Sequence, residues 1–112
     1  MFLVLLNMLV FFSFIIISSC SNDEPIAEEE CTVSFKNEIR PIFESACSIS
    51  GCHVSGFQSG DFSSFDTIRS YALDGRIWFR VGVTRTMPPL NELLEEDINK
   101  IQSWINEGAK NN

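Results

Sequence analysis

The sequence has few of the residue types on which acid–base catalysis and metal binding depend. Its 112 residues contain one histidine, His53, and only one methionine, Met87, beyond the apolar N-terminal stretch. It has no second histidine, no obvious acid–base pair and no glycine-rich loop of the kind that holds phosphate. We therefore expect a protein that is not itself an enzyme.

Basic residues are also scarce. The chain has 8 lysines and arginines against 15 aspartates and glutamates, a net charge of −7. Such a chain is a poor candidate for nucleic acid, because phosphate neutralisation by Lys and Arg supplies much of the affinity. The acidic charge suits a basic partner reached through electrostatic steering, or it serves solubility alone.

Residues 1–19 lack charged side chains altogether and read MFLVLLNMLVFFSFIIISS. This predicts a secretory signal peptide, although the usual basic start is missing. Ile17-Ser18-Ser19-Cys20 resembles a bacterial lipobox, in which cleavage leaves Cys20 as the lipid-modified N-terminus. An uncleaved membrane anchor is the alternative, since about 19 residues just span a bilayer. Either reading places the rest of the chain outside the cytoplasm and tethered to a membrane.

Residues 20–30 are acidic with almost nothing to bury, which predicts a flexible tether. The folded domain is expected over residues 31–112. A domain of this size buries a modest core and usually needs a disulfide, a metal or a cofactor to stabilise it. The next question is which of these the sequence supplies.

Hydrophobic spacing predicts a mostly helical domain with long loops. A helix is expected within residues 34–47, with a kink at Pro41 or a short lead-in before a helix from Pro41. A short helix is expected at 65–72, and loops at 53–64 and 84–91. Residues 75–83 suit either a buried helical turn or a strand. The clearest helix runs from Glu92 or Glu95 to Glu107, ends at Gly108 and has an apolar stripe formed by Leu94, Ile98, Ile101, Trp104 and Ile105.

The segment Cys47-Ser48-Ile49-Ser50-Gly51-Cys52-His53 carries the main chemical signal. Two cysteines followed directly by a histidine are typical of c-type haem attachment, in which two thiols add to the haem vinyl groups. The spacer here has four residues instead of the usual two. Met87 is the one thioether left to face His53, and His/Met ligation is a standard arrangement in cytochromes c. Pro88 and Pro89 stiffen the loop that carries it.

These motifs resemble a known family. SFKNEIRPIFESACSISGCH is similar to the opening of small cytochrome c domains, where an Ile-x-Pro-Ile-Phe helix runs into the haem cysteines. Met87-Pro88-Pro89 resembles their distal methionine loop, and INKIQSWINEGA resembles their closing helix. The resemblance runs from Ser34 to the C-terminus. It is strongest to lipoprotein cytochromes of Bacteroidetes-type bacteria, in which the four-residue spacer also occurs.

The resemblance implies an all-α, cytochrome c-like domain around one covalent haem c. Cys47 and Cys52 would form the thioethers, His53 would be the proximal iron ligand and Met87 the distal one. The protein would transfer single electrons to redox partners in the cell envelope, anchored through a lipid on Cys20 at the outer membrane or the periplasmic face. Four aromatic residues are expected in the haem pocket or the adjoining helix contact: Phe35, Phe43, Trp78 and Trp104. The family often has a Ser or Thr cap where Leu94 stands, so the last helix is expected to start earlier, capped by Asn91.

Three alternatives stay open. A disulfide between Cys47 and Cys52 would give an envelope binding module without haem. A zinc site could use Cys31, Cys47, Cys52 and His53, although the adjacent Cys52 and His53 fit poorly around one tetrahedral ion. A haem with a free distal position could act on peroxide, but this conflicts with ligation by Met87. The sequence does not decide the role of Cys31.

Overall fold

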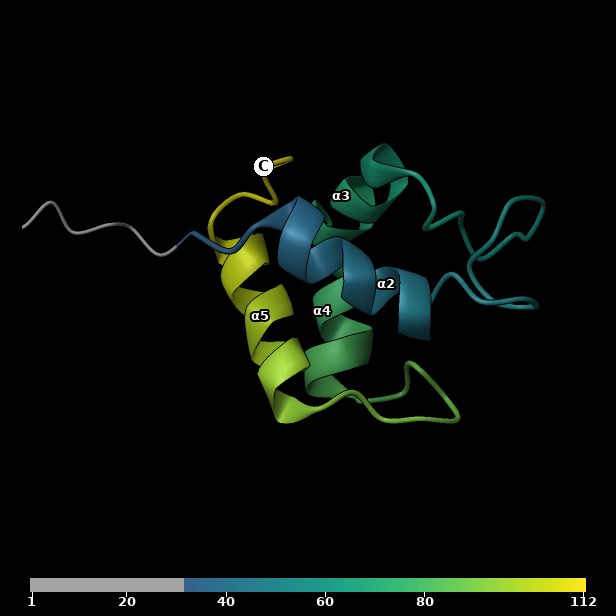
Figure 1. The fold of residues 1–112 in the computed structure, drawn as a ribbon. Coiled ribbons are helices and arrows are strands. Elements are labelled where there is room, and N and C mark those ends of the chain that lie inside the picture. Colours follow the sequence, from purple (N-terminus) through teal and green to yellow (C-terminus); the bar gives the residue numbers. More distant parts are fainter. Residues whose placement is uncertain (1–31) are drawn as a thin grey trace, which may run out of the picture.

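The computed structural model describes residues 32–112, and every regular element in that range is helical (Figure 1). This confirms the all-α prediction for the described part. The predicted signal peptide and tether lie outside it, as do Cys20 and Cys31. None of the described helices is long and apolar enough to cross a membrane. In chain order the elements are η2 (Phe35–Ile39), α2 (Arg40–Ala46), α3 (Phe65–Leu73), α4 (Arg76–Trp78), η3 (Phe79–Val83) and α5 (Glu95–Asn106).

Helix α2 is entered through the π-helical turn η2, and Pro41 explains the wider turn. A proline has no amide hydrogen, and its ring clashes with the carbonyl one turn earlier in an α-helix. In η2 the Arg40 amide donates to the Phe35 carbonyl, five residues back, so the turn before the proline is loosened. The structure thus confirms a lead-in followed by a helix, which begins at Arg40, one residue before Pro41.

Residues 76–83 are helical, which settles the choice between a helical turn and a strand. Gly75 has a φ of 86° and allows the sharp turn between α3 and α4. Helix α4 then continues directly into the π-helical turn η3. Ile77 and Val81, four residues apart, are both buried, so this short segment turns one apolar edge toward the interior.

Helix α5 begins at Glu95, so the expectation of an earlier start capped by Asn91 is wrong. Leu94 takes the cap position with an extended backbone and makes no side-chain cap. It is also 71% exposed, which removes it from the predicted apolar stripe. At the other end Gly108, with a φ of 92°, ends the helix as predicted. Its amide donates to the Ile105 carbonyl, and the next amide donates to the Trp104 carbonyl, as in a Schellman motif.

The two ends of the described chain meet in the core. Phe35 of η2 and Trp104 of α5 are fully buried, with ring centroids 5.4 Å apart. The Trp104 indole N–H donates to the Lys110 carbonyl at 2.9 Å. Asn112 joins the same contact, because its side-chain oxygen accepts from the Phe35 amide at 2.8 Å and its carbonyl accepts from the Lys36 amide at 3.0 Å. The first and last helices are therefore fixed to each other through buried rings and paired backbone groups.

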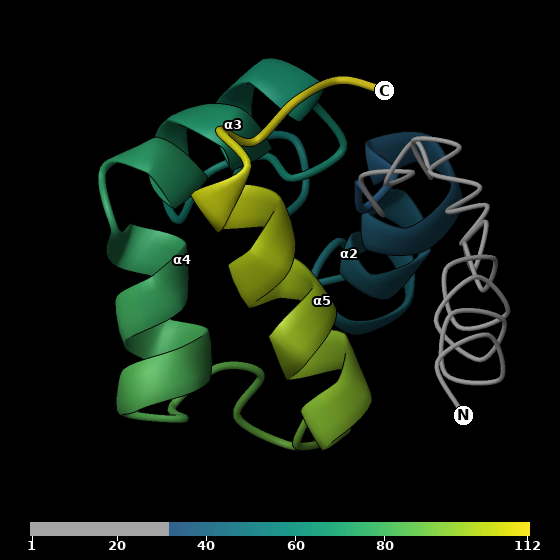
Figure 2. The same ribbon diagram turned by 90° about the vertical axis from the view of Figure 1, so that its left-hand side faces the viewer.

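Helices α4 and α5 lie beside each other with α3 across one end, as Figure 2 shows. The two long loops, residues 47–64 and 84–94, extend on the same side of this arrangement (Figure 1). The helices therefore form a support, and the two loops that carry the predicted site residues project from one side of it.

A substitution at Gly82 tests how tightly Trp78 packs against η3. A Cβ on Gly82 would lie 2.3 Å from the Trp78 ring, well inside contact distance. We expect Gly82→Ala to lower the free energy of unfolding by about 1–3 kcal/mol, the usual cost of overpacking. In a Trp78→Ala background the same change should cost much less, because the clash is gone. Guanidinium unfolding of the four proteins checks this, and an equal cost in both backgrounds would contradict it.

Candidate cofactor site

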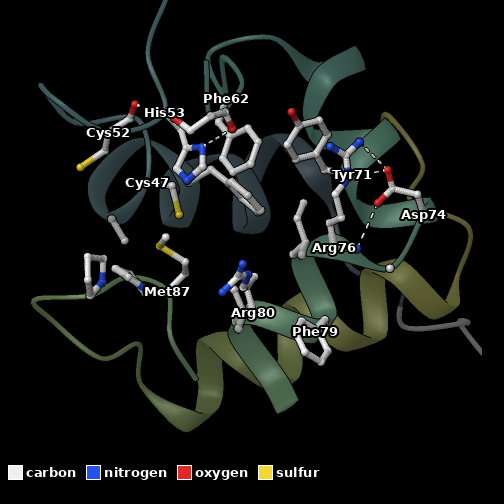
Figure 3. Close-up of a pocket in the computed structure, with 18 of the residues that line it drawn as sticks. Cys47, Cys52, His53, Phe62, Tyr71, Asp74, Arg76, Phe79, Arg80 and Met87 are labelled. Atoms are coloured by element: carbon white, nitrogen blue, oxygen red, sulfur yellow. Dashed lines mark hydrogen bonds and ion pairs between the residues drawn. The ribbon is translucent and has the colours of Figure 1, made fainter. Parts of the chain in front are cut away.

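The two loops and the helices behind them enclose a cavity of about 710 Å³. This lies within the range of roughly 300–1,000 Å³ typical of small-molecule and cofactor pockets. All four residues predicted to hold a cofactor line it: Cys47, Cys52, His53 and Met87 (Figure 3). Much of the remaining wall is apolar and comes from Phe43, Phe62, Ile77, Val81, Pro88 and Pro89.

The segment from Cys47 to His53 closes on itself through backbone hydrogen bonds. Helix α2 ends at Ala46, and the amide of Cys47 donates to the Phe43 carbonyl at 2.9 Å. The His53 amide then donates back to the Cys47 carbonyl at 3.1 Å. Gly51 has a φ of 84°, which permits the reversal between the cysteines. The four-residue spacer therefore forms a compact loop that places both cysteines at the same cavity.

His53 is held in one ring orientation. Its Nδ1 lies 2.9 Å from the Ser59 carbonyl oxygen, which can only accept, so Nδ1 carries the proton. The ring stacks on Phe62, with centroids 4.1 Å apart and planes 3° apart. The other nitrogen, Nε2, keeps its lone pair and points into the cavity (Figure 3). A carbonyl on one nitrogen and a free lone pair on the other is the usual state of a metal-binding histidine.

Met87 enters the cavity from the second loop. The amides of Thr86 and Met87 both donate to the Arg80 carbonyl, at 2.9 and 3.3 Å, which folds the loop back over η3. The loop is also joined to α5 by a two-point ion pair between Arg85 and Glu95. The Met87 side chain is 39% exposed, and its sulfur lies toward the sulfur of Cys47 in Figure 3. The second loop thus brings the Met87 thioether to the same part of the cavity as Cys47.

The two cysteines are free thiols in this structure. Burial, with a smaller contribution from the nearby Cys52, raises the pKa of Cys47 to about 12. The thiolate is the species that attacks in thiol–disulfide exchange, so a thiol this weakly acidic is a slow partner for a disulfide. The Cys52 sulfur is turned away from those of Cys47 and Met87 in Figure 3.

The cavity wall also carries cationic side chains that sequence analysis did not identify. Arg76 is already engaged, since its Nε donates to Asp74 at 2.7 Å and its guanidinium lies 3.4 Å from the centre of the Tyr71 ring. Arg80 donates to the Thr86 hydroxyl at 3.4 Å, but it forms no ion pair with any carboxylate in residues 32–112. In an acidic chain, an arginine at a cavity without an acidic partner is suited to a carboxylate of the ligand.

The four expected aromatic residues divide between cavity and core. Phe43 lines the cavity, whereas Phe35 and Trp104 form the helix contact behind it. Trp78 is half-buried and packs over Gly82, outside the cavity lining. Phe62, Tyr71, Ile77 and Val81 were missed as cavity residues. The spacing of Ile77 and Val81 was a usable signal, whereas Phe62 stood in a stretch dominated by Gly and Ser.

Comparison of the chain with protein-family models, curated proteins and solved structures gave no match. Within residues 32–112 no group of three or more His, Cys, Asp or Glu side chains is placed to hold a metal ion. Cys31, the further ligand that the zinc alternative requires, lies outside the described residues. The resemblance to small cytochromes c rests on the motifs of the sequence.

The raised pKa of Cys47 gives a pH-dependent stability in protein made without haem attachment. Below the ordinary thiol pKa of 9.0 the Cys47 thiol is neutral in both the folded and the unfolded state, so its contribution to stability is fully present. Between about pH 9 and pH 12 only the unfolded chain ionises, so the free energy of unfolding should fall, by up to about 1.4 kcal/mol per pH unit.

Urea unfolding at a series of pH values measures this decline. Cys47→Ala should remove most of it, whereas Cys52→Ala serves as the matched control and should retain it. Curves of equal slope for the unaltered protein and Cys47→Ala would show that the thiol of Cys47 is not the group responsible.

Proposed function

We propose that this protein is a c-type cytochrome that binds one covalent haem and transfers single electrons in the cell envelope. One observation carries the proposal. Cys47, Cys52, His53 and Met87 come from two loops far apart in the sequence, yet all four line the same cavity. The proposal needs this arrangement, because two thiols, an imidazole and a thioether must reach one group.

The lining of the cavity supports a ligand with a large apolar surface and carboxylates. Phe43, Phe62, Ile77 and Val81 supply apolar surface, and Arg80 supplies a cation without an acidic partner in the described residues. Haem has both features, an apolar macrocycle and two propionates. When bound, it would supply an iron couple that changes by one electron.

The residues of the chain would have separate tasks at this group. Cys47 and Cys52 would provide the two thioether sulfurs, and His53 Nε2 and the Met87 sulfur would bind the iron. The Ser59 carbonyl keeps the imidazole in the tautomer that leaves Nε2 free. The Arg80 carbonyl holds the amide of Met87, so the thioether is presented by a fixed backbone and not by a long mobile side chain alone.

The anchoring part of the proposal rests on the sequence. A lipid on Cys20 and an acidic tether over residues 20–30 would let the domain move near a membrane while it stays attached. The domain would then meet donors and acceptors by diffusion, with its negative charge favouring basic partners.

The absorption spectrum of the mature protein, made in a host with cytochrome c maturation, tests the proposal first. We expect haem that remains with the chain after denaturing extraction and gives a c-type pyridine haemochrome. Cys47→Ala with Cys52→Ala should abolish this retention. A colourless protein from the same host would overturn the haem proposal and leave the disulfide module as the stronger reading.

Met87 has its own test in the haem-loaded protein. Met87→Ala should keep the covalent haem, lower its reduction potential and open the iron to carbon monoxide, because a thioether ligand favours the reduced iron and blocks the distal face. Redox titration and carbon monoxide difference spectra measure both effects. Leu73→Ala, at a site that is 51% exposed and lies outside the cavity lining, is the control. An unchanged potential with no new ligand binding would remove Met87 from the site.

A further inference from the structure

A second hollow lies against the cofactor cavity. It is a groove of about 200 Å³ between the end of α2, the loop after Met87 and the start of α5. Four residues line both the groove and the cavity: Ala46, Cys52, Pro88 and Pro89. The two spaces are therefore separated by single side chains, so an occupant of the groove would sit next to whatever fills the cavity.

The rim of the groove exposes large apolar side chains that the fold does not bury. Leu90 is 89% exposed, Leu94 is 71% exposed and Ile49 is 42% exposed, and all three line the groove. Ile49 comes from the loop of residues 47–64, Leu90 from the loop of residues 84–94, and Leu94 is the last residue before α5. Scattered exposed leucines are ordinary, but three gathered at one hollow are typical of a binding surface.

Carboxylates surround this apolar surface. Glu92 and Asp97 line the groove, and neither makes an ion pair with a described residue. Glu95 and Glu96 flank them on the first turn of α5 and are paired with Arg85 and Lys100. The groove lining contains two carboxylates and no basic side chain, so its charge is negative. It would repel an anionic membrane surface and the same face of a second copy of this acidic chain.

We propose that this groove is the docking surface for a basic redox protein, which places an apolar side chain between Leu90 and Leu94 and pairs Lys or Arg with Glu92 and Asp97. The proposal rests on the proposed function. In each encounter one electron passes between the two proteins, so one is oxidised and the other reduced by one unit, with no proton or covalent bond transferred. Cys52 and Pro88 line both the groove and the cavity, so an electron would have a short path between the haem and the redox centre of the docked protein.

The first test maps binding directly and does not depend on the redox state. The probe is a basic blue-copper protein in its redox-inert, metal-substituted form, titrated into isotope-labelled protein. Amide shifts should concentrate at residues 88–97 and 46–52. Leu90→Ser with Leu94→Ser should abolish them, whereas Leu73→Ser, on the exposed end of α3, should not. Shifts elsewhere, or none, overturn the docking surface, as does self-association or binding to anionic vesicles through the same residues.

The second test measures electron transfer by stopped flow with the copper-loaded form of the same probe. Leu90→Ser with Leu94→Ser, and separately Glu92→Gln with Asp97→Asn, should each lower the second-order rate constant by about tenfold. The charge variant should also reduce the dependence of the rate on salt. Ferricyanide, a small anionic oxidant that needs no apolar groove, should react with the leucine variant at an unchanged rate.

The outcomes separate the two proposals. Protein without c-type haem overturns the proposed function, while the shift map still decides whether the groove binds the basic probe. Haem-loaded protein whose rate with the probe is the same in all variants overturns the docking surface and leaves the cytochrome proposal standing. A fall in the ferricyanide rate equal to that with the probe would trace the effect to the haem site and also reject docking.

Discussion

The fold depends on the joining of its first and last helices. Phe35 and Trp104 pack against each other in the core. The backbone amide of Phe35 donates to the side-chain oxygen of Asn112, from the other end of the chain. This contact matters because α2 leads into the cysteine loop, while α5 is tied to the methionine loop through Glu95 and Arg85. A change in the angle between the two helices would move the histidine and the methionine apart. The geometry of the cavity is thus set some distance from it, by a contact that touches none of the predicted ligands.

Sequence reasoning succeeded where one local force decides the structure. Pro41 cannot donate a backbone hydrogen bond, and the turn before α2 is widened to a π-helical turn. Gly108 supplies the left-handed backbone that ends α5. Sequence reasoning failed at Leu94, whose position continues the apolar stripe of α5 but whose side chain is exposed. Periodicity records which residues share a face, whereas exposure depends on whether another segment covers that face, and at Leu94 no described segment does.

The site shows the same division. Residue chemistry singled out Cys47, Cys52, His53 and Met87, and the structure places all four at one cavity. Their role as cofactor ligands stays a prediction. Their common cavity could not be derived, since it depends on how two loops fold back over the helices. The walls were the least predictable part. Phe62 and Arg80 belong to no sequence motif, and they matter only because the fold places them in the lining of the cavity.

The cavity also has a consequence for how the domain comes to be stable. The described residues bury thirteen apolar side chains, eleven of them in the helices, and the 710 Å³ cavity lies directly against this small core. A group that fills this space covers apolar side chains that the empty cavity leaves exposed, so the filled domain is more stable than the empty one. A molecule with a filled cavity should therefore resist proteolysis longer than an empty one, because a protease cleaves the open states that the filling makes rarer.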